Sequence, residues 1–335
     1  MAAIKSVAIT GGAGYVGSAL VPALLDIGYH VKVIDLFLYG EQVFKNIKDH
    51  PNLSLIHGDI RHPDFMIQEL ASIDACIHLA CISNDPSFDL NPALGRSINY
   101  DAFHVLLKAL EINNVHRFIY ASSSSVYGLR DEPDVVEDTP KTPLTDYSKY
   151  KLLCEDALIN WESKPEDLDW VIIRPATVCG YAPRLRLDLT VNILTIHALI
   201  NGKIRVFGGK QLRPNIYIQD MVRAYLTLLE SDQSSISGKI FNAGYHNESV
   251  ENIALTVRKV LGDGRAEIVY EPTDDLRSYH VNSDKIHRQL GFVTEYTLED
   301  AVESIRDAYD NGRIKDGLNN EYYHNIKRMQ NTNLQ

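Results

Sequence analysis

The sequence predicts an α/β fold in which a doubly wound parallel sheet is followed by a smaller C-terminal α/β lobe. Three observations support this prediction. In the first half of the chain, short apolar runs alternate with longer segments of helical spacing, as in parallel sheets with helices on both faces. A glycine-rich turn joins the first apolar run to the first helical segment. Beyond about residue 180 the alternation becomes looser.

The apolar runs have the length and continuity of strands that are buried on both faces. They are SVAITG (6–11), VKVID (31–35), LSLIHGD (53–59), ACIHLA (75–80), RFIYASS (117–123) and WVIIRPA (170–176). The intervening helical segments end near Gly28, Ile73 and Asn114. Right-handed crossovers between such strands give a parallel sheet.

The second half of the chain reads as helices with brief strands between them. Helices are expected at 190–202, 217–230, 249–262 and 297–312, and strands near 204–207, 239–243 and 266–270. We therefore predict a first domain at residues 1–180, to which segments at about 213–245 return, and a second lobe at 181–315. Residues 316–335 are expected to form a surface helix and a frayed tail.

Charge and composition exclude several classes of protein. A net charge of −11 and a pI near 5.5 argue against nucleic-acid or anionic-membrane partners. No apolar run approaches the ~18 residues of a membrane span. The 4 cysteines form no CxxC pair and no signal peptide precedes them, so we expect reduced thiols in a cytoplasmic protein. The scattered histidines predict no metal site.

The first glycine-rich turn has the pattern of a dinucleotide site. In TGGAGYVG, Gly12, Gly14 and Gly17 form a GxGxxG between the first strand and the first helix. Small residues there let backbone N–H groups approach a pyrophosphate, which the positive end of the helix stabilises. A lone GxGxxG is often only a tight turn, but its place in a βαβ unit favours a Rossmann-type domain. The expected contacts come from Gly11, Gly14, Tyr15 and Val16.

Acidic residues at two strand ends predict which dinucleotide binds. Asp35 ends the second strand, where a carboxylate can accept both ribose hydroxyls and would repel a 2′-phosphate, so NAD is favoured over NADP. Asp59 and Ile60 follow the third strand and are expected to meet the adenine. The alternatives are a solvated aspartate at Asp35 and a plain turn at 59–60.

The stretch DYSKYK places a tyrosine and a lysine on one helix face. Tyr147 and Lys151 are four residues apart, so both side chains can act on one object. An ammonium about 6.5 Å from the phenol, at an effective dielectric of ~20, contributes roughly 2.5 kcal/mol and would lower the tyrosine pKa. Taken alone, the pair also fits an exposed helix surface. The serine run at 122–125 follows the fifth strand, on the edge of the sheet where ligands bind.

Together and in this order, the motifs resemble the extended short-chain dehydrogenase/reductase family, in particular its nucleotide-sugar epimerases and dehydratases. The matching stretches are TGGAGYVG (10–17), GDI (58–60), HLA (78–80), INYDAF with Asn99, SSSSVYG (122–128), YSKYK (147–151), RPATVCG (174–180) and RPNIYIQDMVRA (213–224). They lie within about residues 4–310. The resemblance implies bound NAD, Tyr147 as acid/base, Lys151 on the nicotinamide ribose and Ser123 as catalytic hydroxyl, a role that Ser122 or Ser124 could share. The further cofactor contacts that it implies are Leu79, Ala80, Asn99 and Ser122.

The same resemblance implies a nucleotide-diphosphate sugar as substrate, held by the second lobe. The family's diphosphate contacts would fall on Asn192, Arg213 and Arg277, and Arg184 and Arg186 are further candidates, because a guanidinium binds phosphate through two parallel hydrogen bonds. Surface solvation is the alternative for these arginines. Ser83, Asn84, Ser124 and Thr177 are expected beside the sugar. Thr177 and Cys179 depart from the family pattern, which has an asparagine and an aromatic residue there.

The expected activity is NAD-dependent oxidation at C4 of a nucleotide-linked sugar. Dehydratases of this family carry an acid and a base after the catalytic hydroxyl, where this chain has Ser124 and Ser125, so we favour a 4-epimerase with a transient 4-keto intermediate. Net C4 dehydrogenase, ketone reductase or 4,6-dehydratase activity stays open. A non-catalytic dinucleotide-sensing protein and a reductase of hydrophobic alcohols are the rivals from other classes. Family resemblance also suggests a homodimer through helices at about 92–113 and 146–163.

Overall fold

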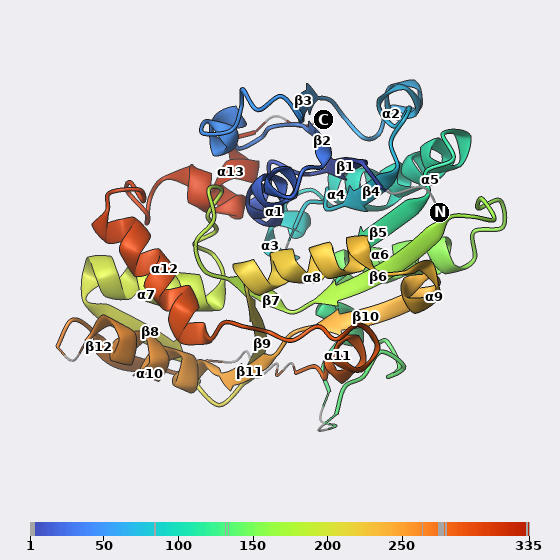
Figure 1. Cartoon of the computed structure of the whole chain (residues 1–335). Helices are drawn as coiled ribbons and strands as arrows, with labels where there is room; N and C mark the ends of the chain where they lie inside the picture. The colour runs from blue at the N-terminus through green and yellow to red at the C-terminus, as the bar shows by residue number, and fades with distance from the viewer. Residues whose placement is uncertain are drawn as a thin grey trace.

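The central sheet places the ends of its strands along one edge. The computed structural model describes residues 4–332 and 334, apart from 84, 131, 133, 263, 274–277 and 279. Within these residues, seven parallel strands lie in the order β10-β6-β5-β4-β1-β2-β3 (Figure 1). Their bounds are β1 Ser6–Thr10, β2 His30–Asp35, β3 Leu53–His57, β4 Ala75–His78, β5 Arg117–Ala121, β6 Asp169–Pro175 and β10 Lys239–Ala243. The strand order reverses between β1 and β4, and a crevice at such a point is where doubly wound sheets bind ligands.

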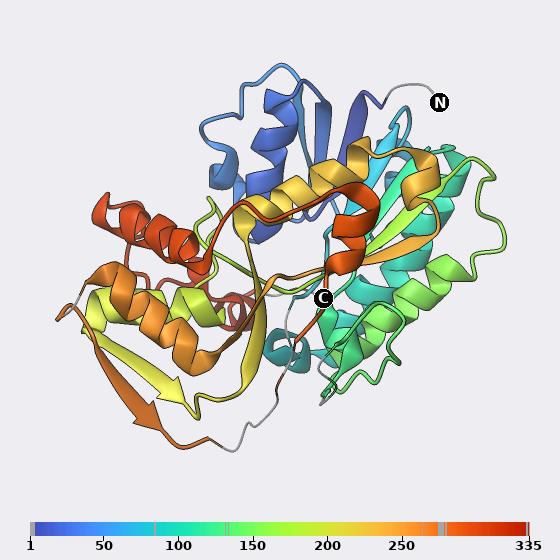
Figure 2. The ribbon, with the colours of Figure 1, turned by 60° about the horizontal axis from the view of Figure 1, so that its bottom comes forward.

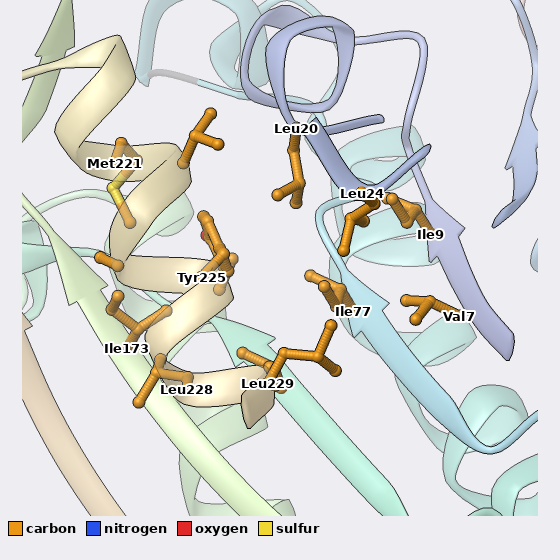
Figure 3. Close-up of a cluster of buried hydrophobic side chains, with 14 of the residues drawn as sticks. Val7, Ile9, Leu20, Leu24, Ile77, Ile173, Met221, Tyr225, Leu228 and Leu229 are labelled. Carbon is orange, nitrogen blue, oxygen red and sulfur yellow. The ribbon is translucent and has the colours of Figure 1, made fainter. Parts of the chain in front are cut away.

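Helices cover both faces of this sheet. On one face α1 (Tyr15–Asp26) packs against α8 (Ile218–Glu230). Figure 3 shows side chains of α8, including Met221 and Tyr225, facing Leu20 and Leu24 of α1 on the same face of the sheet. The other face carries α2 (Pro63–Glu69), α5 (Ala102–Ile112) and α6 (Asp146–Ile159), which share a second buried cluster with β4 and β5. The apolar continuity of the strands follows from this two-sided burial.

The second lobe has its own core. It contains α7 (Thr190–Asn201), α10 (Val250–Leu261) and α12 (Leu298–Asp310) over the parallel pair β8 (Lys203–Phe207) and β12 (Glu267–Glu271). A small sheet of β11 (His246–Ser249), β9 (Leu212–Tyr217) and β7 (Thr177–Cys179) links the two parts (Figure 2). Because β10 pairs with β6 and α8 packs on α1, most of the segment at 213–245 lies with the first domain, as the boundaries in the sequence analysis have it.

Shorter elements complete the chain. They are η1 (Glu41–Phe44), α3 (Asp85–Asp89), α4 (Pro92–Arg96), the π-helical η2 (Ser97–Asp101), η3 (Ser124–Tyr127), α9 (Gln233–Ile236), α11 (Asp284–Leu290), η4 (Glu321–Tyr323) and α13 (Asn325–Gln330). The helix expected at about 92–113 therefore contains a π turn. No helix among the described residues is both long enough and apolar enough to cross a membrane.

The end of the chain differs from its prediction. Residues 316–332 do not form a free surface tail, because Tyr323 is 6% exposed and Asn325 only 4% exposed. This segment returns to the sheet domain, where α13 packs against α3. Burial of two residues of this segment shows that it packs as part of the fold.

Candidate active site

A cleft of about 510 Å³ runs along the carboxyl edge of the sheet. Its walls come from the β1–α1 turn, the ends of β2, β4 and β5, the start of α6, and residues of the second lobe. Among the predicted site residues that line it are Gly11, Gly14, Tyr15, Val16, Asp35, Asp59, Ile60, Leu79, Ala80, Ser83, Ser122, Ser123, Ser124, Tyr147, Lys151, Thr177, Arg184 and Arg213. The volume is in the range of ligand pockets, and the strand ends bring these distant residues together.

The glycine turn has the shape that a pyrophosphate site needs. A Cβ on Gly11, which has φ +74°, would lie 2.5 Å from the Ala80 Cα, and one on Gly17 would lie 2.5 Å from the Gly12 Cα. These glycines therefore let β4, β1 and α1 approach closely. Gly14 precedes α1, and no side chain caps that helix N-terminus. The open N–H groups and the positive helix end fit the diphosphate of a dinucleotide.

Asp35 is held at the ribose position by two backbone donors. Its Oδ2 accepts from the Ala13 N–H at 2.9 Å and its Oδ1 from the Phe37 N–H at 2.7 Å. Burial raises the pKa of Asp35, and these two hydrogen bonds and the nearby Arg184 and His57 oppose that rise. These two hydrogen bonds leave further lone pairs of the Asp35 carboxylate free to accept hydrogen bonds from ribose hydroxyls.

The adenine end also carries an acidic residue. Asp59 pairs with Arg61 at 2.6 Å. Burial tends to raise the pKa of Asp59, but the hydrogen bonds and charge of Arg61 outweigh it and lower that pKa. This carboxylate is thus an anion, held by Arg61 at the far end of the cleft, with Ile60 beside it.

Helix α6 presents the tyrosine and the lysine to the cleft. Thr145 caps the helix, and Ser148 returns the hydrogen bond in a capping box, so the helix starts one residue before Tyr147. Lys151 lies one turn later, with its Nζ 5.9 Å from the centre of the Tyr147 ring. That Nζ donates to the Ala121 carbonyl at 2.6 Å. The lysine therefore ties α6 to the end of β5.

The pKa of Tyr147 is set differently from the sequence expectation. Burial raises it, and the nearby Cys81 and Asp85 raise it further. The positive charge of Arg186 and a hydrogen bond with Ser123 lower it. The charge of Arg186, which the sequence analysis did not connect with this phenol, is thus among the causes that lower its pKa. In this state the phenol is protonated.

The four serines after β5 have different partners. The Ser122 hydroxyl donates to Glu155 and is 5% exposed. Ser123 lies against the Tyr147 phenol, and its Oγ accepts from the Ser125 hydroxyl at 2.9 Å. These contacts favour Ser123 as the hydroxyl that shares a substrate oxygen with Tyr147, and they leave Ser122 in a supporting position. Ser124 and Ser125 also line the cleft.

A buried ionic network lies directly behind the serines. Glu155 is on the same α6 face as Tyr147 and Lys151, two turns from the tyrosine. Arg174 on β6 donates to both of its carboxylate oxygens, at 2.9 and 2.6 Å. The arginine also donates to the Tyr127 hydroxyl at 2.7 Å, so the network holds both ends of the serine turn.

Not every predicted contact reaches the cleft. Asn192 is fully buried, and its amide bonds to the backbone of Gly180 and Arg186. Asn99 bonds both backbone groups of Ile82. Neither is among the residues that line the cleft, and both side chains support its walls. Asn84 and Arg277 lie outside the described residues.

Other cleft residues were missed as site residues or only suggested. Arg186, a secondary candidate, reaches the reactive end and pairs with Asp188 at 2.9 Å. Cys81 and Asp85 follow the HLA motif but match no pattern known to us. Asn325 and Met329 enter from the end of the chain and carry no motif that could have indicated them.

Comparisons with known proteins agree with this geometry. The model of the NAD dependent epimerase/dehydratase family matches residues 7–244. A probable UDP-arabinose 4-epimerase of Oryza sativa subsp. japonica is 27% identical and covers 91% of this chain and 79% of its own. The dTDP-D-glucose 4,6-dehydratase of Homo sapiens is 27% identical and covers 97% and 93%. A solved UDP-glucuronic acid 4-epimerase from Bacillus cereus, in complex with UDP-glucuronic acid and NAD, has a TM-score of 0.82 at 27% identity, with 92% and 99% covered.

Proposed function

The chain belongs to the NAD dependent epimerase/dehydratase family, and from that premise we propose that it is a nucleotide-sugar 4-epimerase. It oxidises C4 of a nucleotide-linked sugar to a ketone and reduces that ketone from the other face. The observation that carries this proposal is the group of reactive side chains at the carboxyl edge of the sheet. The Tyr147 phenol is hydrogen-bonded to Ser123, and Lys151 lies one helical turn away. The serine run contains no acidic residue.

The residues of the chain have distinct roles in this reaction. The glycine turn and Asp35 would hold NAD, which would supply the acceptor and donor of the C4 hydride. Tyr147 takes the proton of the C4 hydroxyl and gives it back after the sugar has turned over. Ser123 hydrogen-bonds the same oxygen as its charge develops. Lys151 holds the end of β5 and stands beside the nicotinamide ribose.

The serine run supports epimerisation over dehydration. Loss of water across C5 and C6 needs a base for the C5 proton and an acid for the C6 hydroxyl. Ser124 and Ser125 occupy the positions after the catalytic hydroxyl, and an unassisted serine hydroxyl is too weak for either step. Cys81 and Asp85 line the cleft near Tyr147 and would be candidates for such an acid and base if this chain did dehydrate a sugar.

Cationic side chains support a substrate with a diphosphate. Arg186 and Arg213 line the cleft. A guanidinium recognises phosphate through paired, charge-assisted hydrogen bonds. Ser83, Ser123, Ser124 and Thr177 also line the cleft, where the sugar hydroxyls would find neutral donors and acceptors.

A substrate panel tests the proposal. The protein, loaded with NAD, is incubated with UDP-, GDP-, CDP- and dTDP-linked sugars, and the products are identified by NMR. We expect one sugar pair that differs only in configuration at C4. The Tyr147→Phe variant serves as the control and should leave each sugar unchanged. Failure of every nucleotide sugar to react would favour a non-catalytic dinucleotide-binding protein.

We further propose a homodimer in a reducing, cytoplasmic compartment. Helices α5 and α6 expose Ile112, Leu153 and Ile159, each at least 40% accessible, although α6 also buries Cys154 and Leu158 on its other side. Apolar residues on two sides of one helix suit a helix bundle between two copies. Sedimentation should give a dimer that Leu153→Glu dissociates, whereas Leu255→Glu, at an exposed leucine of α10, should not. The free cysteines agree with a reducing compartment.

A further inference from the structure

The end of the chain crosses the cleft. Residues 320–332, which we call the C-terminal strap, contain η4 and α13. The strap is tied to the second lobe where the Leu187 N–H donates to the Tyr323 carbonyl at 3.0 Å and the Tyr322 hydroxyl donates to the Pro183 carbonyl at 3.0 Å. From there α13 runs to the sheet domain, where it packs against α3 and contacts the loop after β2. The strap thus spans both sides of the cofactor cleft.

Asn325 joins three separate walls of the cleft. Its Oδ1 accepts from the Tyr39 hydroxyl at 3.0 Å, in the loop after β2, and from the Arg184 guanidinium. Its Nδ2 donates to the Ser83 hydroxyl at 2.9 Å, in the loop after β4. Asn325 is 4% exposed and itself lines the cleft. One amide therefore connects the ribose side, the second lobe and the sugar side.

Arg184 is a buried cation that lies within the field of Asp188, but Asp188 forms an ion pair with Arg186. Arg184 is 1% exposed, it lies 3.6 Å from the centre of the Tyr39 ring, and no carboxylate among the described residues forms an ion pair with it. The Nε of Arg184 has no hydrogen-bond partner among the described residues. Because a buried charge is costly unless it is paired, this guanidinium fits an anion bound in the cleft. Arg184 is on the dinucleotide side, since its backbone N–H donates to the Ser18 hydroxyl of α1.

A second contact closes the strap over the cofactor. The Arg328 Nε donates to the Leu38 carbonyl at 2.6 Å, and its guanidinium also pairs with Glu321. Leu38 and Tyr39 belong to the loop that follows Asp35, and both line the cleft. Met329 packs against the cluster of Ile82 and Phe88 and lines the cleft. A dinucleotide seated along β1 and β2 would lie under these contacts.

We propose that the C-terminal strap completes the NAD site, with Asn325 holding Arg184 on the diphosphate of the dinucleotide and Arg328 fastening the strap over it. NAD then leaves only after the strap releases the loop after β2. This inference rests on the proposed function for its cofactor alone and does not depend on the sugar. Slow release of NAD suits an enzyme that regenerates its cofactor within each catalytic cycle.

The test measures NAD release in the absence of any sugar nucleotide. Full-length protein is loaded with radiolabelled NAD, chased with excess unlabelled NAD, and followed by filter retention. Asn325→Ala and Arg328→Ala should each release NAD about tenfold faster, because each removes a hydrogen bond to a charged group. Lys327→Ala is the matched control on α13, since its exposed side chain contacts only the Leu318 carbonyl, and it should release NAD as the unmodified protein does.

Two further measurements make the outcome decisive. Melting temperatures show whether a variant has lost its fold, and Arg328→Ala, which lies outside the cleft, carries the test if Asn325→Ala unfolds. Affinity for UDP, measured by calorimetry, should stay the same in both variants. Release within twofold of the unmodified protein in the folded variants would overturn the proposal, as would weakened UDP affinity with unchanged NAD release. Failure of the epimerase assignment would leave these release rates unaffected.

Discussion

Tyr147 is the single side chain on which turnover depends. Replacing it with phenylalanine removes one hydroxyl and leaves the packing of α6 intact, so NAD should still bind while turnover falls by ~10²-fold or more. Tyr150→Phe is the matched control, because it makes the same change on the same helix against Phe88 and outside the cleft. Activity and bound NAD are measured for both variants. More than about a tenth of the activity in Tyr147→Phe would remove the phenol from its assigned role.

Arg186 should set the pH dependence of that phenol. Its positive charge lowers the pKa of Tyr147. Removing the charge in Arg186→Gln raises that pKa, so less phenolate is present at a given pH and the rising limb of the kcat profile should move to higher pH. The profile is measured at saturating substrate for both proteins. An unchanged limb, or a shift to lower pH, would show that Arg186 does not act on the phenol.

Asp35 should decide between the two dinucleotides. Asp35→Asn keeps the size of the side chain and one acceptor for the Ala13 and Phe37 N–H groups, but it removes the charge that repels a 2′-phosphate. NAD binding should weaken and NADP binding should improve, so the preference for NAD over NADP should become smaller. Titration with both dinucleotides measures the ratio. An unaltered ratio would mean that Asp35 does not read the ribose.

Predictions for single residues from sequence depended on how local their contacts are. Tyr147 and Lys151 could be paired because their spacing fixes a shared helix face. The contact of Arg186 with Tyr147 joins residues 39 positions apart, and only the folded chain shows it. The choice among the serines likewise required the Glu155 contact, which occupies Ser122. Asn192 matched a family position, yet the structure uses its amide to hold the backbone of the second lobe.

Among the elements, the junction of α6 with β6 should be the most costly to disturb. Arg174 and Glu155 are 0% and 1% exposed, so Arg174→Met leaves a carboxylate buried without its charged partner. We expect a loss of about 3–5 kcal/mol in the free energy of unfolding. Lys108→Met breaks the exposed Lys108–Glu111 pair on α5 and should cost less than about 1 kcal/mol. Urea titrations compare the two, and similar small losses would contradict a structural role for the buried pair.

The elements that were predicted well are those with two buried faces. The six strand runs appear in the sheet because both faces are covered, so their apolar letters are continuous. The small sheet of β7, β9 and β11 was not foreseen, since its strands are short and carry polar residues such as Asn215 and Glu248. The π turn around Asn99 left no periodicity signal, because the helical pattern continues on both sides of it.

The complete chain contains one large feature that its sequence does not reveal. The strap holds Tyr39 and Ser83 through Asn325, across separations of 286 and 242 residues. A tail rich in Asn, Gln and Lys has the composition of an exposed end, and its burial depends on the cleft that the rest of the chain builds. The sequence therefore predicts a cofactor end and a reactive end of the site, but not the segment that joins them.

The fate of the C4 hydrogen tests the central claim most directly. A nucleotide sugar that the enzyme accepts is labelled with deuterium at C4 and incubated with the NAD-loaded protein in ordinary water. The account predicts the C4 epimer with its deuterium retained at C4 and no accumulation of reduced cofactor. A product lighter by one water, with the deuterium moved to C6 and a solvent hydrogen at C5, would contradict it.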